Sequence, residues 1–451
     1  MKVSLPVNYK AALWIIAAGM ALRLLVLALC LDTPLFGDAH AYHRFAMMYL
    51  NGESFDTVRA PGLSLWLAAW YGVFGAGQLS SMLSILPFHL ILSAAIYYYS
   101  ARLVNARAAL IALALISFYP SFVFHSVWPL TQVPMAAALA LTLYLLDSKP
   151  SPTHALAAGL LLGFAILLRP NCVILAPVLS LIILLRKNRR AFVSASVLLA
   201  VSLAPALLWS AREYRHSGNL VFINYTNSMN LYLGNNRFTP LYKTWWFGSH
   251  GQGARDVPAE FSDRLSAIRE IPLSSRNKVY LKGAIDEITT RPGVFIVRTL
   301  SRIRTFFAFD TYTGTQVIKR FGHGKIVGAS VLGLVMLFYL AIISACLLFY
   351  LGRGARENGS TIGAMIPAAA VAYAFPFWLA FSHPTYHLPL LPLLAIPTAA
   401  VLERLIRNPS CIREYFSRDG INYRLIIALA ILLLIQLEWV LVMSASFYEA
   451  I

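Results

Sequence analysis

Long apolar runs restrict the fold of this chain more than any other feature of its sequence. Eleven runs are candidates for membrane-spanning helices, each of which takes about 20 apolar residues. We therefore predict an all-α, polytopic membrane protein with about eleven transmembrane helices. The fifth and sixth runs are short and meet at Arg169-Pro170-Asn171, so we expect them to be tilted or broken. The expected spans are 11–31, 79–104, 107–125, 130–147, 154–169, 171–186, 191–210, 325–351, 361–381, 385–402 and 425–445.

Composition supports the same class. Of 451 residues, 59% are hydrophobic and only 12% are charged, whereas soluble domains carry about a quarter charged residues. The formal charge is +18, from 37 Lys and Arg against 19 Asp and Glu. In a membrane protein this excess is typical of basic cytoplasmic loops and of a surface that faces anionic lipid. We expect membrane lipids, and no nucleic acid, as partners.

The basic residues also predict the orientation of the chain. They concentrate in alternate short loops, most densely in residues 186–190 and 404–424. The positive-inside rule assigns these loops to the cytoplasm. The outward side then carries the first loop, 32–77, the turn at Arg169, the turn at 382–389 and the C-terminus.

The predicted spans divide the chain into three parts. Residues 1–210 form an N-terminal transmembrane core that contains the outer loop 32–77. Residues 211–324 form a small periplasmic loop subdomain, which we expect to be mainly helical, most clearly in its second part, and folded onto the bundle. Residues 325–451 form the C-terminal transmembrane helices.

The first outer loop holds a cluster of titratable residues. Asp38 is suited to act as a general base on an attacking hydroxyl group, although its position before an apolar-periodic run also fits a helix N-cap. His40 and His43 lie one helical turn apart, with Glu53 and Asp56 nearby in sequence. These residue types can bind a metal ion, and the alternative is a wet surface of hydrogen-bonded imidazoles.

Arginines near the predicted membrane surface are candidates for binding a lipid phosphate. Arg59 precedes a tight turn and a run rich in Trp and Tyr, residues 63–74, so it can hold a phosphate or extend to the headgroups. Arg23 lies inside the first predicted helix. An ionisable residue at that depth is a functional candidate, with pairing to Asp32 or extension toward the surface as alternatives.

Two further polar strings occur on the outward side. Residues 230–236, Asn-Leu-Tyr-Leu-Gly-Asn-Asn, form a turn-forming string in which Gly234 permits a close approach of the backbone to a ligand. The turn at 382–389 places Tyr386 and His387 at the mouth of a helix. His387 can neutralise a phosphate, and the alternative is an interfacial aromatic anchor.

Taken in order, these strings resemble the GT-C glycosyltransferases that use polyprenyl-phosphate sugars. The likeness is strongest to the bacterial branch related to protein mannosyltransferases and aminoarabinose transferases. The matching positions are Asp38, Tyr42, Ala46, Leu50 and Gly52, then 59–64, Phe74-Gly75, Leu168-Arg169-Pro170, 230–236 and 385–392.

The resemblance implies a specific activity. The chain would be an inverting transferase that moves a sugar from a polyprenyl-phosphate donor to an acceptor glycan, lipid or protein. Transfer would take place at the periplasmic face of a bacterial inner membrane, with Asp38 as the catalytic acid residue and no cofactor. The candidate residues for binding the donor are His40, His43, Arg59, Arg169, Tyr232, Asn235, Asn236, Tyr386 and His387.

The sequence departs from the family pattern in its acids. Many relatives carry a second acid beside the first, where this chain has Ala39 and His40. A Glu is common in the second outer loop, where this chain reads Thr131-Gln132, and Thr385 stands where relatives have Arg. The missing acids argue against a metal held by carboxylates, so we predict no metal.

A rival class is a transporter or flippase of lipid-linked saccharides. Such proteins place ionisable residues near the middle of the bilayer, often on broken helices. This chain places them mostly at one mouth of the bundle, with Arg23 as the main exception and Glu438 near the outer end of the last helix. The sequence therefore favours an enzyme.

Overall fold

The computed structural model describes residues 9–53, 58–147, 151–218, 221–242, 244, 257–320, 324–352, 364–417 and 421–449, with the backbone alone at 274, 417 and 442–449. The structure is 82% helical, and its described residues form no strand. The predicted all-α fold is therefore confirmed.

A helix occupies each of the eleven predicted runs. Among the described residues, six segments are long and apolar enough to cross a membrane by length and composition, and the others are shorter apolar helices. The helices are α1 (Tyr9–Leu29), α4 (Gln78–Leu83) with α5 (Leu86–Leu103), α6 (Ala106–Phe118) with α7 (Pro120–His125), α8 (Gln132–Leu146), α9 (Pro152–Leu168), η1 (Pro170–Ile174) with α10 (Leu175–Leu184), α11 (Arg189–Ser217), α17 (Gly324–Leu351), α18 (Met365–Leu379), η5 (Pro384–Leu390) with α19 (Leu391–Arg407), and α21 (Tyr423–Glu449).

Prolines break several of these segments. Pro170 begins the short 3₁₀ helix η1, and the preceding Arg169 is extended, with φ −146° and ψ 106°. Pro120 begins α7 in the same way after Tyr119. Proline lacks a backbone N–H and disfavours a helical residue before it, so helices end at these points. The predicted break at Arg169 is confirmed.

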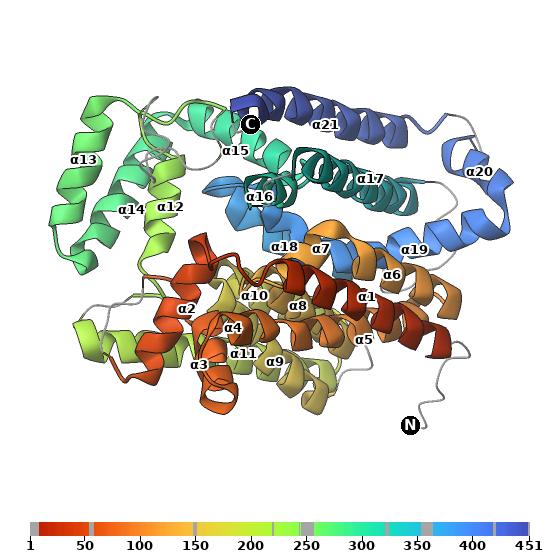
Figure 1. Cartoon of the computed structure of the whole chain (residues 1–451), viewed down its shortest axis with the longest axis horizontal. Helices are drawn as coiled ribbons and strands as arrows, with labels where there is room; N and C mark the ends of the chain where they lie inside the picture. The colour runs from red at the N-terminus through yellow and green to blue at the C-terminus, as the bar shows by residue number, and fades with distance from the viewer. Residues whose placement is uncertain are drawn as a thin grey trace.

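The remaining helices lie outside the spans. They are α2 (Gly37–Leu50), α3 (Gly62–Phe74), α12 (Thr226–Gly234), α13 (Ala259–Glu270), α14 (Leu273–Thr290), α15 (Pro292–Phe306), α16 (Tyr312–Arg320), η6 (Pro409–Cys411) and α20 (Ile412–Ser417). Figure 1 shows α2 and α12–α14 gathered at one end of the bundle, here called the loop end. Helix α1 begins at the opposite end and α21 finishes near the loop end, as an odd number of crossings requires.

The sequence suggested a turn at 230–236, but the structure shows no turn over this string. It lies largely in α12, and Gly234 is the last residue of that helix. A Cβ at Gly234 would overlap the carbonyl oxygen of Ala380. The glycine therefore allows α12 to pack against the end of α18, and does not leave room for a ligand there.

Arg23 also differs from expectation. Its side chain is fully buried, and neither pairs with Asp32 nor extends toward the surface. Its Nε donates to Ser126 Oγ at 3.0 Å, and its Nη1 donates to the carbonyl oxygens of Gly19 and Ser117 at 2.9 and 2.8 Å. Arg23 thus ties α1 to α6 and to the end of α7, which gives it a structural role.

Candidate functional site

Asp38 lies in the first turn of α2, where a negative charge interacts favourably with the helix dipole. The N-cap of this helix is Phe36, which makes no capping bond with its side chain, so the N-cap interpretation of Asp38 is wrong. Its Oδ1 accepts a hydrogen bond from Arg59 Nη1 at 2.8 Å. The side chain of Asp38 is 56% exposed and that of Arg59 is 36% exposed, so a reactant can reach this ion pair.

A close contact of two helices places Arg59 near the end of α9. A Cβ at Gly62, the first residue of α3, would lie 2.7–2.8 Å from backbone atoms of Leu167 and Leu168. Only glycine allows this approach. It brings the segment that carries Arg59 beside Arg169, the C-cap of α9.

Arg169 is a partly exposed cation without a carboxylate partner among the described residues. Its Nε donates to Thr131 Oγ1 at 3.0 Å. Its guanidinium carbon lies 5.3 Å from the ring centroid of Tyr386. A cation held this way, with no acid to neutralise it, is suited to bind an anion.

Tyr42 of α2 lies between these charges. The guanidinium carbon of Arg59 is 5.9 Å from its ring centroid. Burial and the Asp38 carboxylate raise the pKa of Tyr42, while Arg59 and Arg169 act in the opposite direction. Together with the packing of Gly62 against the end of α9, this indicates that Arg169 lies near the Asp38–Arg59 pair.

His43 faces α3 and α4. The Ser81 hydroxyl donates to the Gly77 carbonyl at 2.7 Å, so it accepts from the Tyr71 hydroxyl. The Tyr71 oxygen then accepts from His43 Nδ1 at 2.8 Å. Burial, and then the neighbouring His40, lower the pKa of His43. This chain of hydrogen bonds orients the His43 ring, with Nδ1 as the donor to Tyr71.

The remaining titratable residues of the loop do not surround a metal position. His40 is exposed on α2, and Glu53 accepts a hydrogen bond from Asn51 at 2.9 Å. Asp56 lies outside the described residues. Across the part of the chain that the structure describes, no group of three or more His, Cys, Asp and Glu side chains is arranged to hold a metal ion.

Three predicted donor-binding residues lie among the loop helices, and of these Asn235 also bonds to the end of α18. Asn235 donates to Leu231 O and Leu379 O at 3.0 and 2.9 Å. Asn236 donates to the carbonyl of Tyr232 at 2.9 Å, and the Tyr232 ring is buried in an apolar cluster. The structure does not bring these side chains to Asp38, and their role in donor binding stays a prediction without geometric support.

His387 is buried behind Tyr386. Its Nδ1 lies 2.7 Å from the carbonyl oxygen of Phe306, and its ring centroid lies 4.8 Å from that of Tyr339. The structure thus brings Tyr386 to Arg169 and turns His387 toward α15 and α17. Phosphate binding by His387 stays a prediction.

Sequence reasoning did not include Thr131 and Asp310 among the candidate site residues. Thr131 holds Arg169, and the sequence marked this position only as the place where relatives carry a Glu. Asp310 is fully buried after α15. The sequence did contain a signal for Asp310, because it is a lone acid in the apolar string Phe-Ala-Phe-Asp. An unpaired carboxylate in such surroundings is costly, so a carboxylate found there needs specific partners.

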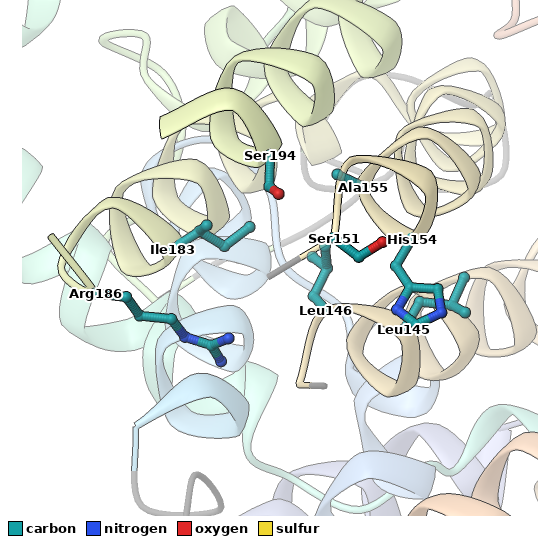
Figure 2. A pocket seen from close by; sticks show the side chains of 8 residues that line it. All are labelled: Leu145, Leu146, Ser151, His154, Ala155, Ile183, Arg186 and Ser194. Atoms are coloured by element: carbon teal, nitrogen blue, oxygen red, sulfur yellow. The ribbon is translucent and has the colours of Figure 1, made fainter. Parts of the chain in front are cut away.

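One pocket lies far from this cluster. It is a small hollow with a volume of about 10 Å³, lined by Leu145, Leu146, Ser151, His154, Ala155, Ile183, Arg186 and Ser194. Figure 2 shows these side chains coming from the end of α8, the start of α9, the end of α10 and the start of α11. Because α9 runs from this pocket to Arg169, a distance of roughly 25 Å at 1.5 Å per residue, the pocket is not part of the candidate site.

Comparisons with known proteins agree with this architecture. Residues 58–209 match the family of dolichyl-phosphate-mannose-protein mannosyltransferases. A search of curated proteins found no match.

Solved structures of the Archaeoglobus fulgidus oligosaccharyltransferase share the fold. The Archaeoglobus fulgidus oligosaccharyltransferase matches over 93% of this chain and 51% of its own, with 16% identity and a TM-score of 0.52, in its complex with Zn and sulfate. Its apo form matches over 94% of this chain and 54% of its own, with 15% identity and a TM-score of 0.51. ArnT from Cupriavidus metallidurans, bound to undecaprenyl phosphate, matches over 89% and 80%, with 14% identity and a TM-score of 0.40.

The chain spans about half the length of the oligosaccharyltransferase it matches. The likeness covers nearly all of this chain, including the spans and the loop helices between them. The family match covers the segment that carries Arg59 and Arg169. Both comparisons point to GT-C glycosyltransferases: residues 58–209 match one such family, and the fold of this multi-pass membrane protein is similar to that of the oligosaccharyltransferase.

Proposed function

We propose that this protein transfers a sugar from a polyprenyl-phosphate donor to an acceptor hydroxyl or amide, with inversion at the anomeric carbon. The acceptor is a cell-envelope glycan, a lipid such as lipid A, or a protein. The reaction takes place at the periplasmic face of a bacterial inner membrane, where the loop end of the bundle lies. The family description, which names a dolichyl-phosphate sugar, supports a lipid-phosphate donor.

One observation carries this proposal: an accessible carboxylate pairs with one arginine, and a second arginine, which has no acid partner in the described structure, lies at the adjoining end of α9. Asp38 pairs with Arg59 at 2.8 Å, and Arg169 is held by Thr131 and Tyr386. A carboxylate provides a proton acceptor, and guanidinium groups provide planar donors for phosphate. Sugar transfer from a lipid phosphate requires both groups close together.

The residues have separate roles in this reaction. Asp38 takes the proton from the acceptor group as its oxygen or nitrogen attacks the anomeric carbon. The bond between that carbon and the phosphate oxygen breaks, and its electron pair stays with the lipid phosphate. Arg169 and Arg59 stabilise the negative charge that develops there. A single displacement of this kind inverts the anomeric centre.

The test is a transfer assay with purified protein in nanodiscs. Polyprenyl-phosphate sugars are supplied one at a time with membrane extract as the source of acceptor, and the released polyprenyl phosphate is measured. We expect release from at least one donor, and we expect the rate to survive EDTA, because the acids that relatives carry beside Asp38 are absent. Movement of intact donor across the bilayer without release would instead indicate a flippase.

A further inference from the structure

A buried acid outside the proposed site connects the loop to the bundle. Asp310 follows α15 and is fully buried. No Lys or Arg forms an ion pair with it within the described part of the chain. A buried carboxylate without a cation is costly unless hydrogen bonds satisfy it. The bonds that Asp310 makes should therefore indicate why it is there.

Three donors satisfy the Asp310 carboxylate. Its Oδ2 accepts from Ser121 Oγ of α7 and from Thr313 Oγ1, both at 2.7 Å. Its Oδ1 accepts from the backbone N–H of Tyr312 at 2.8 Å. Tyr312 and Thr313 form the first turn of α16. Asp310 thus fixes the first turn of α16 to α7.

The other end of α16 reaches the start of α2. Arg320, its last residue, places its guanidinium carbon 3.3 Å from the ring centroid of Phe36. Phe36 is the N-cap of α2, two residues before Asp38. An arginine over an aromatic face is attracted to the negative face of the ring. Helix α16 therefore joins the Asp310 anchor to the segment that positions Asp38.

The first turn of α16 also lies near Asp38. The Tyr312 ring packs against an apolar cluster that includes Phe36, Ala39 and Trp128. Burial, and then the Asp38 carboxylate, raise the pKa of Tyr312. The phenol therefore stays protonated within electrostatic reach of Asp38.

We propose that Asp310 and Arg320 are positioning residues for the transfer reaction. They fix the two ends of α16, which holds the start of α2 so that the Asp38 carboxylate points at the acceptor. This inference rests on the proposed function, in which Asp38 is the proton acceptor. Neither residue touches the substrate, and neither contributes to holding the lipid phosphate.

The test separates turnover from lipid binding in four purified variants. Asp310→Ala removes the acceptor of three hydrogen bonds, and Arg320→Gln removes the contact with Phe36. A misplacement of about 1 Å can cost about 10²-fold in rate, so we expect kcat to fall by about 10- to 100-fold in both variants. The affinity for undecaprenyl phosphate should stay within about twofold of wild type, because Arg169 is untouched.

Two variants serve as controls. Asp310→Asn keeps the size and the acceptor for the Tyr312 N–H, and the hydroxyl groups of Ser121 and Thr313 can rotate to accept from its amide, so we expect kcat near that of wild type. Lys319→Gln makes the same change of charge as Arg320→Gln on an exposed neighbour, and should leave kcat unchanged.

Each outcome is decisive. Unchanged kcat in Arg320→Gln overturns the proposal, even where Asp310→Ala does not fold. An equal loss of kcat and of lipid affinity also overturns it, because that pattern indicates general damage to the site. If wild type neither binds the lipid phosphate nor turns over donor, the proposed function fails, and the positioning role fails with it. If wild type does both and the variants match it, the positioning role alone is wrong.

Discussion

The pairing of Asp38 with Arg59 is weak enough to be exchanged during a reaction cycle. Both side chains are partly exposed, and exposed ion pairs contribute only about 0–1 kcal/mol. A phosphate group binds a guanidinium through two parallel hydrogen bonds, so a donor can take Arg59 from Asp38 at little cost. Donor binding would then leave the carboxylate ready to accept a proton.

Asp38→Asn tests the carboxylate alone. The change keeps the size of the side chain and removes the proton acceptor, so turnover should fall by about 10²–10⁴-fold. Affinity for the lipid phosphate should change little, because Arg169 remains. The measurement is kcat and undecaprenyl-phosphate affinity in nanodiscs, with the melting temperature as a check on folding. Asp32→Asn, at an exposed acid just before α2, is the matched control. Near-normal turnover in Asp38→Asn would show that the Asp38 carboxylate has no part in the mechanism.

Arg169→Gln tests the cation. A hydrogen bond to a charged group is worth about 1.5–3 kcal/mol, so the dissociation constant for undecaprenyl phosphate should rise by about 10- to 100-fold. Arg269→Gln, an exposed arginine on α13, should leave it unchanged. Equal binding by both variants would show that the phosphate is held elsewhere.

Much of this residue-level detail can be predicted from the sequence. Asp38, Arg59 and Arg169 stand out because charged groups beside hydrocarbon are costly and need a reason. Their mutual contact cannot be predicted, because it depends on Gly62 packing against the backbone of α9. The apolar string around Asp310 marks it as a candidate, but its hydrogen bond with Ser121 cannot be predicted, since that partner lies on a distant helix.

At the scale of elements, buried arginines of α15 attach the loop helices to the bundle. Arg302 is fully buried, and its Nη1 donates to Leu379 O of α18 at 2.7 Å. Its Nη2 donates to Gly234 O and to Asn235 Oδ1 of the α12 segment. A guanidinium at the carbonyl ends of two helices is favoured by both dipoles.

Arg302→Met should therefore destabilise the protein. Methionine fills much of the space but leaves buried oxygen atoms without donors, at about 1–3 kcal/mol each, so we expect a loss of at least about 2 kcal/mol. The measurement is the melting temperature in detergent. Arg291→Met is the control, because it breaks only a partly exposed ion pair with Glu287. It should lower the melting temperature far less. Equal melting temperatures would contradict this account of the attachment.

The same contact explains why α12 could not be predicted as a helix. Its Asn and Gly residues favour turns when read locally. In the structure, Asn236 Nδ2 donates to Tyr232 O at 2.9 Å near the end of the helix. Its Oδ1 accepts from Phe238 N and Thr239 N at 2.9 and 3.1 Å in the turn that follows. Contacts with α15 and α18 therefore override the local preference.

At the scale of the whole molecule, the sequence predicts the spans well and their arrangement poorly. Apolar length and proline positions suffice to locate the helices, because both act locally. The gathering of α2 and α12–α14 at one end of the bundle (Figure 1) follows from the connectivity of the spans. Which side chains then meet depends on tertiary packing, which periodicity does not encode.

Orientation is open to a direct test. We expect the loop end to face the periplasm, because the basic short loops lie at the other end. The four native cysteines are buried, so they should contribute little to the labelling of a single cysteine introduced at the surface. Ser275→Cys on α14 should react with an impermeant maleimide in intact spheroplasts, and Thr153→Cys at the start of α9 should react only after lysis. The reverse pattern would place Asp38 in the cytoplasm.

The central claim is that Asp38 and Arg169 serve sugar transfer from a lipid phosphate, and one comparison in cells tests it most directly. Lipid extracts and envelope glycans are analysed by mass spectrometry in cells that lack the gene, complemented with wild type or with Asp38→Asn. We predict that a polyprenyl-phosphate sugar accumulates, and that one glycan, lipid or protein modification disappears, in the deletion and in the Asp38→Asn strain. Wild type should reverse both changes. Full restoration by Asp38→Asn, or no change in any polyprenyl-linked sugar, would contradict the account.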